Sequence, residues 1–155
     1  MTQPQPAARI IVGLDRNGSH NDTVLAAALG QARLTKAAVS VVHAIAPDTA
    51  TTAVSLDTAA SHDRRAARQA RHDAATEDLH RLLAKAPRDG DAPITVDYDV
   101  RHGDPATVLL SAAQHANLIV IGTHRTGARS PLLLGTVSQD VAVHATCPVL
   151  LIPTP

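Results

Sequence analysis

Short apolar runs alternate with amphipathic segments along the whole chain. Five runs rich in Val, Ile and Leu are too short for helices and predict β-strands at residues 9–14, 38–45, 94–100, 118–121 and 149–152. Between them, apolar residues recur at helical spacing and predict helices over residues 19–35, over 58–86, and after residues 104 and 135. This βαβαβαβαβ order is typical of an α/β domain with a parallel sheet and helices on both faces.

Local sequence signals predict where three of the helices begin. Residues 19–22 (SHND) fit a capping box, and Thr136 with Gln139 forms the S/T-x-x-Q version of the same motif. Asp104 followed by Pro105 combines a strong N-cap with a proline at the first helical position. We therefore expect side-chain caps at all three helix starts.

Composition limits the class of protein. Residues 1–8 are rich in Pro and Gln and predict a disordered tail, whereas residues 9–153 have the length of one domain. The only aromatic residue among Phe, Trp and Tyr is Tyr98, and the formal net charge is zero, which disfavours a nucleic-acid partner. No signal region or membrane span is evident, and Cys147 is the single cysteine, so we expect a cytoplasmic protein.

The most informative stretch runs from Gly122 to Gln139. A strand stops at Gly122, a loop without acidic residues follows, and Gly135 precedes a predicted helix. A glycine-bearing loop leading into a helix N-terminus predicts an anion site, because free backbone N–H groups point at the ligand. In parallel sheets ligands bind beyond the carboxyl ends of the strands. The other candidates at that edge are Gly13 and Asp15 after the first strand, and His43 and Ala44 in the second.

These residues lie in segments that resemble the universal stress protein family. The segments read RIIVGLDRNGSH, VVHA, GDPATVLLSAAQHANLIVIGTHR and LLLGTVSQDVAVHATCPVLLIP, and the resemblance covers about residues 9–153. It implies a UspA-like domain with a five-stranded parallel Rossmann-like open sheet in the strand order 3-2-1-4-5. It also implies a stress-response or signalling role, regulatory rather than enzymatic, and a homodimer. An unpaired apolar edge at residues 149–152 favours the same dimer, because two-fold strand pairing would cover that edge.

The ATP-binding branch of that family carries the motif G-x2-G-x9-G-[ST]. Gly122 and the pair Gly135-Thr136 match its ends, but Arg125 stands at the middle glycine. The resemblance implies that Asp15 meets the ribose and that the backbone of Ala44 recognises adenine. It further implies that the first-strand loop passes the ligand at Gly13 and that the phosphates lie against Gly122, Gly135, Thr136 and Val137.

Arg125 leaves two interpretations open. Arginine lacks the backbone freedom of glycine, but its guanidinium can pair with a phosphate. We expect an adenine nucleotide to bind, as ATP with or without Mg²⁺ or as AMP or cyclic AMP, with His124, Arg125 and the Thr136 and Ser138 hydroxyls in contact with it. In the alternative, Arg125 and His124 fill the loop, and a nucleotide-free stress protein acts through protein–protein contacts.

Other chemistry finds little support in the sequence. No H-x-G-H, S-G-G-x-D-S or G-x-S-x-G signature occurs, so we expect no catalytic residues, and slow ATP hydrolysis is a weaker alternative. The nine histidines do not have metal-ligand spacings, so we expect no metal site. Arg64, Arg65, Arg68 and Arg71 form a basic stripe that we interpret as a solvated helix face. The sequence does not identify a signalling partner.

Overall fold

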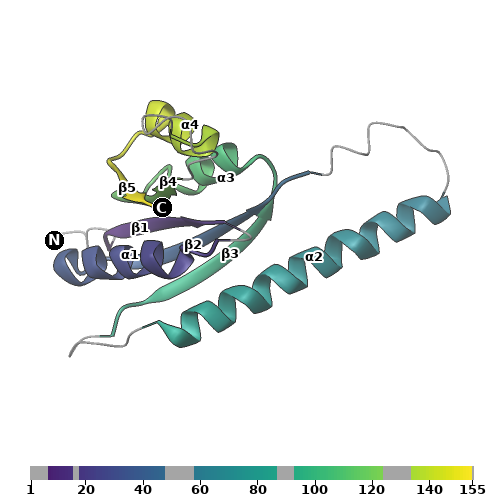
Figure 1. Cartoon of the computed structure of the whole chain (residues 1–155), viewed down its shortest axis with the longest axis horizontal. Coiled ribbons are helices and arrows are strands. Elements are labelled where there is room, and N and C mark those ends of the chain that lie inside the picture. The colour runs from purple at the N-terminus through teal and green to yellow at the C-terminus, as the bar shows by residue number, and fades with distance from the viewer. Residues whose placement is uncertain (1–6, 16–17, 48–57, 87–92, 124–133, 155) are drawn as a thin grey trace, which may run out of the picture.

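A computed structural model describes residues 7–15, 18–47, 58–86, 93–123 and 134–154, of which 58–60 are described by their backbone alone. Strands and helices alternate throughout these residues (Figure 1). In chain order the elements are β1 (Arg9–Leu14), α1 (Asn21–Thr35), β2 (Ala38–Ile45), α2 (Thr58–Lys85), β3 (Val96–His102), α3 (Pro105–Ala112), β4 (Leu118–Thr123), α4 (Thr136–His144) and β5 (Val149–Pro153).

The strands form one parallel sheet in the order β3-β2-β1-β4-β5. The predicted α/β class and the strand order 3-2-1-4-5 are therefore confirmed. The chain moves from β1 to β2 on one side and later returns to place β4 on the other side of β1. This reversal next to β1 opens a crevice at the carboxyl ends of β1 and β4, which is where such sheets bind ligands.

Two apolar layers sandwich the sheet. Helices α1 and α2 cover one face, where Ile10 and Val12 of β1 pack with Leu25 and Leu79. Helices α3 and α4 cover the other face, where Ile11 packs with a separate set that includes Leu109 and Val141. Each fully buried aliphatic side chain contributes about 1.5–3 kcal/mol to folding, so the interior strands hold the site rigidly from both sides.

Strand ends differ from the predicted bounds in one substantial case. The strand predicted at residues 94–100 lies at Val96–His102, because its ladder with β2 begins at Val39 opposite Val96 and continues to Ile45 opposite His102. β4 and β5 also extend further than predicted, to Thr123 and Pro153. In each case the strand continues for as long as a neighbouring strand offers backbone partners.

Of the three predicted side-chain caps, one is confirmed and two are wrong. Asp104 caps α3, because its Oδ2 accepts from the Thr107 N–H at 3.0 Å and from the Thr107 hydroxyl at 2.9 Å. The N-cap of α1 is His20, and no side chain of the described residues caps that helix. The N-cap of α4 is Gly135, which has no side chain to offer, and Thr136 lies within the helix.

Among the described helices, none is both long enough and apolar enough to cross a membrane. The longest, α2, is polar along most of its length and extends well past the ends of the strands (Figure 1).

Candidate functional site

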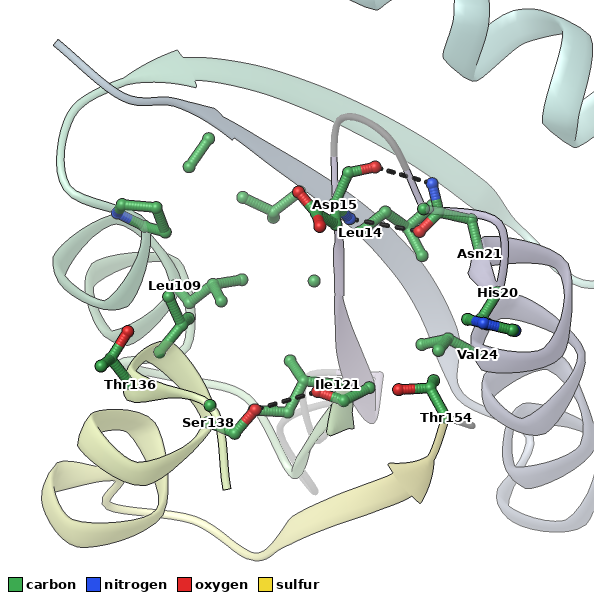
Figure 2. Close-up of a pocket in the computed structure, with 18 residues that line it drawn as sticks. Leu14, Asp15, His20, Asn21, Val24, Leu109, Ile121, Thr136, Ser138 and Thr154 are labelled. Carbon is green, nitrogen blue, oxygen red and sulfur yellow. Dashed lines mark hydrogen bonds between the residues drawn. The ribbon is translucent and has the colours of Figure 1, made fainter. Parts of the chain in front are cut away.

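A cavity of about 280 Å³ opens at the carboxyl ends of β1 and β4. Figure 2 shows its walls, which are formed by α1 on one side, by α3 and α4 on the other, and by the strand ends beneath. The lining residues are Gly13, Leu14, Asp15, Gly18, His20, Asn21, Val24, Val42, Ala44, Pro105, Leu109, Ile121, Gly122, Gly135, Thr136, Val137, Ser138 and Thr154.

Apart from His43, the sequence-predicted site residues that the structure describes converge on this cavity. Four separate segments of the chain contribute them: Gly13 and Asp15, Ala44, Gly122, and Gly135 to Ser138. His124 and Arg125 lie outside the described residues. The cavity also includes residues that the sequence did not single out, among them Asn21, Leu109 and Thr154.

The floor of the cavity depends on Gly13. A Cβ at this position would lie 2.8 Å from Ile121 Cγ2 and 2.9 Å from both Leu109 methyl carbons. Since real Cβ atoms do not approach so closely, glycine lets β1 and the side chains of Ile121 and Leu109 meet without a gap. Gly122 is less tight, with a Cβ expected 3.2 Å from Val24 and Thr154.

Asp15 is held at the rim by Asn21. The Asn21 Oδ1 accepts from the Asp15 N–H at 3.2 Å, and the Asn21 Nδ2 donates to the Asp15 carbonyl at 2.7 Å (Figure 2). The amide therefore clamps both backbone groups of Asp15 and positions its carboxylate beside the cavity. Gly18 leaves room for this clamp, because a Cβ there would lie 2.3 Å from the Asn21 Oδ1.

His43 supports the same loop from the other face of the sheet. Its ring is 4% exposed, and its Nδ1–H donates to the Leu14 carbonyl at 3.1 Å, immediately before Asp15. His43 does not line the cavity, whereas its neighbours Val42 and Ala44 do. Its Nε2 is buried without a hydrogen-bond partner among the described residues. Sequence analysis grouped His43 with the site, and the structure places it behind the site as a backbone support.

The opposite wall is the first turn of α4. The Gln139 N–H bonds to the Gly135 carbonyl, so the N–H groups before it precede the intrahelical ladder. No described side chain caps this turn. The error in the predicted capping box is therefore informative, because an uncapped turn keeps its backbone donors available. Together with the helix dipole, they make this wall of the cavity attractive to an anion.

Ser138 makes a structural contact that the sequence did not predict. It is 3% exposed, and its hydroxyl donates to the Gly122 carbonyl at 2.9 Å (Figure 2). Its proton is thus already engaged and does not point to a ligand. Ser138 instead ties the start of α4 to the end of β4. Thr154 fixes the neighbouring corner, since its N–H donates to the Thr123 Oγ1 at 3.3 Å and its hydroxyl donates to the Thr123 carbonyl.

Charge in the cavity is sparse. Among its described lining residues, Asp15 is the only carboxylate, and none is Lys or Arg. Aliphatic side chains form much of the remaining surface, chiefly Val24, Val42, Leu109 and Ile121. Backbone donors lie on the α4 side and a carboxylate lies at the rim, so the arrangement suits a ligand with an apolar body, hydroxyl groups and an anionic end. Within the described residues, no group of three or more His, Cys, Asp and Glu side chains is placed to hold a metal ion.

Comparison with known proteins gives one family. The universal stress protein family model matches residues 7–153. A universal stress protein of Mycolicibacterium smegmatis is 41% identical over 59 residues, which span 38% of this chain and 20% of that protein. One of Thermus aquaticus is 50% identical over 52 residues, which span 32% of this chain and 38% of that protein. The matches thus cover well under half of each relative's length.

Solved structures with this fold cover nearly the whole chain. The universal stress protein UspA of Lactobacillus plantarum has a TM-score of 0.66 and 20% identity, over 96% of this chain and 99% of its own. A universal stress protein in complex with cAMP has a TM-score of 0.65 and 18% identity, over 97% and 100%. The Archaeoglobus fulgidus protein in complex with dAMP has a TM-score of 0.55 and 22% identity, over 94% and 97%.

Proposed function

This chain belongs to the universal stress protein family, and we propose that its cavity binds an adenine nucleotide as a regulatory ligand. The observation that carries the proposal is the uncapped first turn of α4, which faces a cavity whose rim holds Asp15. An anion-binding wall and a hydroxyl-binding carboxylate on one cavity match the two ends of a nucleotide's ribose phosphate.

Each part of a nucleotide has a counterpart in the cavity. The phosphate lies at the N–H groups of Thr136 and Val137, where the helix dipole stabilises negative charge by about 0.3–1 kcal/mol at an exposed site. The ribose hydroxyls donate to Asp15, which Asn21 already positions. Adenine lies among the aliphatic side chains, beside the backbone of Ala44 at the end of β2. If Mg²⁺ accompanied ATP, the Asp15 carboxylate would offer the cation an oxygen ligand.

Two related proteins support the choice of base. The structures of universal stress proteins with this fold include one in complex with cAMP and one in complex with dAMP. These ligands share adenine and a single phosphate, which is the combination that we propose for the cavity of this chain. ATP, AMP and cyclic AMP are therefore the ligands to compare.

We assign the ligand a regulatory rather than a catalytic role. The described lining residues offer one carboxylate and one histidine, His20, as titratable side chains. The Ser138 hydroxyl donates to the Gly122 carbonyl and is not paired with a base, whereas the activated nucleophiles of hydrolases depend on such a pair.

We also propose that two copies pair through β5. This strand is an edge of the described sheet. The Ile119 N–H bonds to the Pro148 carbonyl, so the alternation of a parallel ladder directs the backbone groups of Val149 and Leu151 away from β4. A two-fold axis beside β5 would satisfy those groups in both copies.

Isothermal titration calorimetry of the full chain with AMP, cyclic AMP and ATP, with and without Mg²⁺, tests the nucleotide proposal. Asp15→Asn removes the charge of the ribose acceptor and should weaken the preferred nucleotide about 10–100-fold, since hydrogen bonds to charged groups contribute about 1.5–3 kcal/mol. The matched control is Asp22→Asn, which removes an exposed carboxylate outside the cavity and should leave the affinity unchanged.

If a folded wild-type protein binds none of these nucleotides, the proposal fails and the nucleotide-free interpretation replaces it. If both variants weaken binding equally, the effect is general electrostatics and Asp15 is not the ribose acceptor.

A further inference from the structure

In the part of the chain that the structure describes, the N-terminal half of α2 is largely exposed. His72 stacks on His102, the last residue of β3, with ring centroids 5.8 Å apart. The helix begins at Thr58, so about four turns, or roughly 21 Å at 1.5 Å per residue, extend past the edge of the sheet (Figure 1). Every residue from 61 to 70 is exposed. We call this part, residues 58–71, the α2 overhang.

In the overhang, arginines take the place of leucines on the helix face that packs against the sheet further along α2. Leu79, Leu82 and Leu83 pack against the sheet from the C-terminal half of the helix. Arg64 precedes Leu82 by five complete helical turns, and Arg65 precedes Leu83 by the same interval. Arg68 precedes Leu79 by about three turns. These three arginines, the arginine face, therefore lie on the stripe that is apolar where a partner exists.

The positive charge of the arginine face affects His102 at the end of β3. The pKa of His102 is lowered, first by partial burial and then by the neighbouring charge of Arg68, with smaller contributions from His72 and Arg71. The nearby acidic residue Asp73 accepts a hydrogen bond from Gln69 and does not lie on the arginine face. The guanidinium groups thus form a local cationic surface on a chain whose formal net charge is zero.

Packing against a partner would also stabilise the overhang. Isolated helices shorter than about 12–15 residues are marginal in water, and most helical stability comes from tertiary packing of one face. A partner that covers the overhang would supply that packing. Since this face carries arginine in place of leucine, an anionic partner is complementary to it.

We propose that the arginine face of the α2 overhang is a docking surface for an acidic protein segment, one that presents Asp or Glu along a helix or an extended strand. Arginine favours this occupant, because its planar fork pairs bidentately with carboxylates. The overhang carries no lysine from residue 61 to 71.

Other polyanions fit the overhang less well. Single-stranded nucleic acid is usually held by aromatic stacking, and Tyr98 is the only Phe, Trp or Tyr in the chain. A helix that lies on an anionic membrane needs large apolar side chains opposite its basic face. The overhang has alanines there, at residues 66, 67 and 70.

The test is fluorescence anisotropy of the full chain with a labelled alanine-based peptide that carries glutamates at i, i+4 spacing. The same peptide with glutamine in place of glutamate is the ligand control. We expect binding of the glutamate peptide alone, with an affinity that decreases as salt increases. The triple variant Arg64→Gln, Arg65→Gln, Arg68→Gln should weaken it tenfold or more, since each exposed ion pair can contribute up to about fivefold. Glutamine has similar helix propensity, so the helix itself is retained.

The matched variant removes three positive charges elsewhere: Arg33→Gln, Arg81→Gln and Lys85→Gln. It should bind the peptide nearly as the wild type does. Amide hydrogen exchange provides a second readout, because the peptide should protect residues 61–71 in the wild type and not in the arginine-face variant.

Four results would overturn the proposal. The first is no binding of the glutamate peptide at low salt, and the second is an equal loss in both triple variants. The third is tighter binding of oligo-dT or of phosphatidylserine vesicles than of the peptide. The fourth is protection of residues 61–71 in peptide-free protein that increases with protein concentration, because the occupant would then be a second copy of this chain.

Discussion

Replacing Gly18 by alanine tests the clamp that holds Asp15 at the cavity. The added Cβ would lie 2.3 Å from the Asn21 Oδ1 and 2.6 Å from its Cγ, so the amide must leave its position. Among the described residues, the three nearest atoms to that Cβ all belong to the Asn21 side chain. In the folded state, Gly18→Ala should therefore act by displacing Asn21.

The expected magnitude follows from the two hydrogen bonds of the clamp. Each contributes about 0.5–1.5 kcal/mol net, and because both are exposed we expect Asn21→Ala to lower the free energy of unfolding by about 1–2 kcal/mol. Gly18→Ala loses the same bonds but restricts the unfolded chain, which offsets about 0.4–1 kcal/mol. In the wild type it should destabilise by roughly 1 kcal/mol net. In an Asn21→Ala background the clash is absent, and the same change should stabilise by about 0.4–1 kcal/mol.

Urea unfolding of the wild type, both single variants and the double variant gives this double-mutant cycle. The sign of the Gly18→Ala effect should reverse between the two backgrounds, with a coupling energy of about 1–2 kcal/mol. If Gly18→Ala changes the free energy of unfolding equally in both, the clamp is not what Gly18 protects, and the account of how Asp15 is positioned is wrong.

Three further outcomes follow from other parts of the fold. By NMR titration, the pKa of His102 should lie below its usual value of 6.5. The contribution of neutral His102 to stability is therefore complete above pH 6.5 and decreases as pH falls through the lowered pKa. Arg68→Gln should raise the pKa of His102, and an unchanged pKa in that variant would contradict the proposed field of the arginine face. Asp104→Ala should lower the free energy of unfolding by about 1 kcal/mol at pH 7, or Tm by roughly 2–4 °C. The pKa of the Asp104 carboxyl is lowered chiefly by the Thr107 N–H, and the loss should disappear in acid once this carboxyl is protonated. Leu151→Pro should convert the proposed dimer to a monomer in light scattering, because proline removes an outward N–H of β5; a monomeric wild type would contradict the proposed pairing.

Much of the fold could be predicted because its signals are local. The interior strands β1 and β4 are continuous apolar runs, and such runs mark strands that are buried on both faces. The position of β3 is harder to predict from sequence. Its end at His102 depends on pairing with Ile45 of β2, and side-chain patterning carries no information about how far a neighbour extends.

Some residues of the candidate site could likewise be predicted from local sequence signals, and others could not. Gly13 and Gly135 lie in recognisable strand–loop and loop–helix junctions, so sequence could place them together. The sequence predicts Asn21 as part of a helix cap. Asn side chains commonly bond to nearby backbone in short loops, and this tendency could have indicated its contact with Asp15. Thr154 had no such signal, because it reaches the cavity only through its bonds to Thr123 across the sheet.

The two wrong capping boxes have a common cause. Short motifs of Ser, Thr, Gln and Asp occur often by chance, and only the backbone conformation decides whether they act as caps. At α4 the residue before the motif, Gly135, takes the cap position with φ −60° and ψ 155°, so Thr136 enters the helix. That one-residue shift leaves the first turn uncapped and creates the wall on which the proposed function depends.

The most direct test of the central claim is a nitrogen–proton correlation NMR titration of the labelled full chain with AMP, cyclic AMP and ATP. Adenine-nucleotide binding in the cavity predicts saturable shifts at the amides of Gly13, Ala44, Gly122 and Gly135 and in the first turn of α4, while amides of the α2 overhang remain unchanged. The absence of shifts with all three nucleotides at millimolar concentration, or shifts confined to residues away from the cavity, would contradict the account.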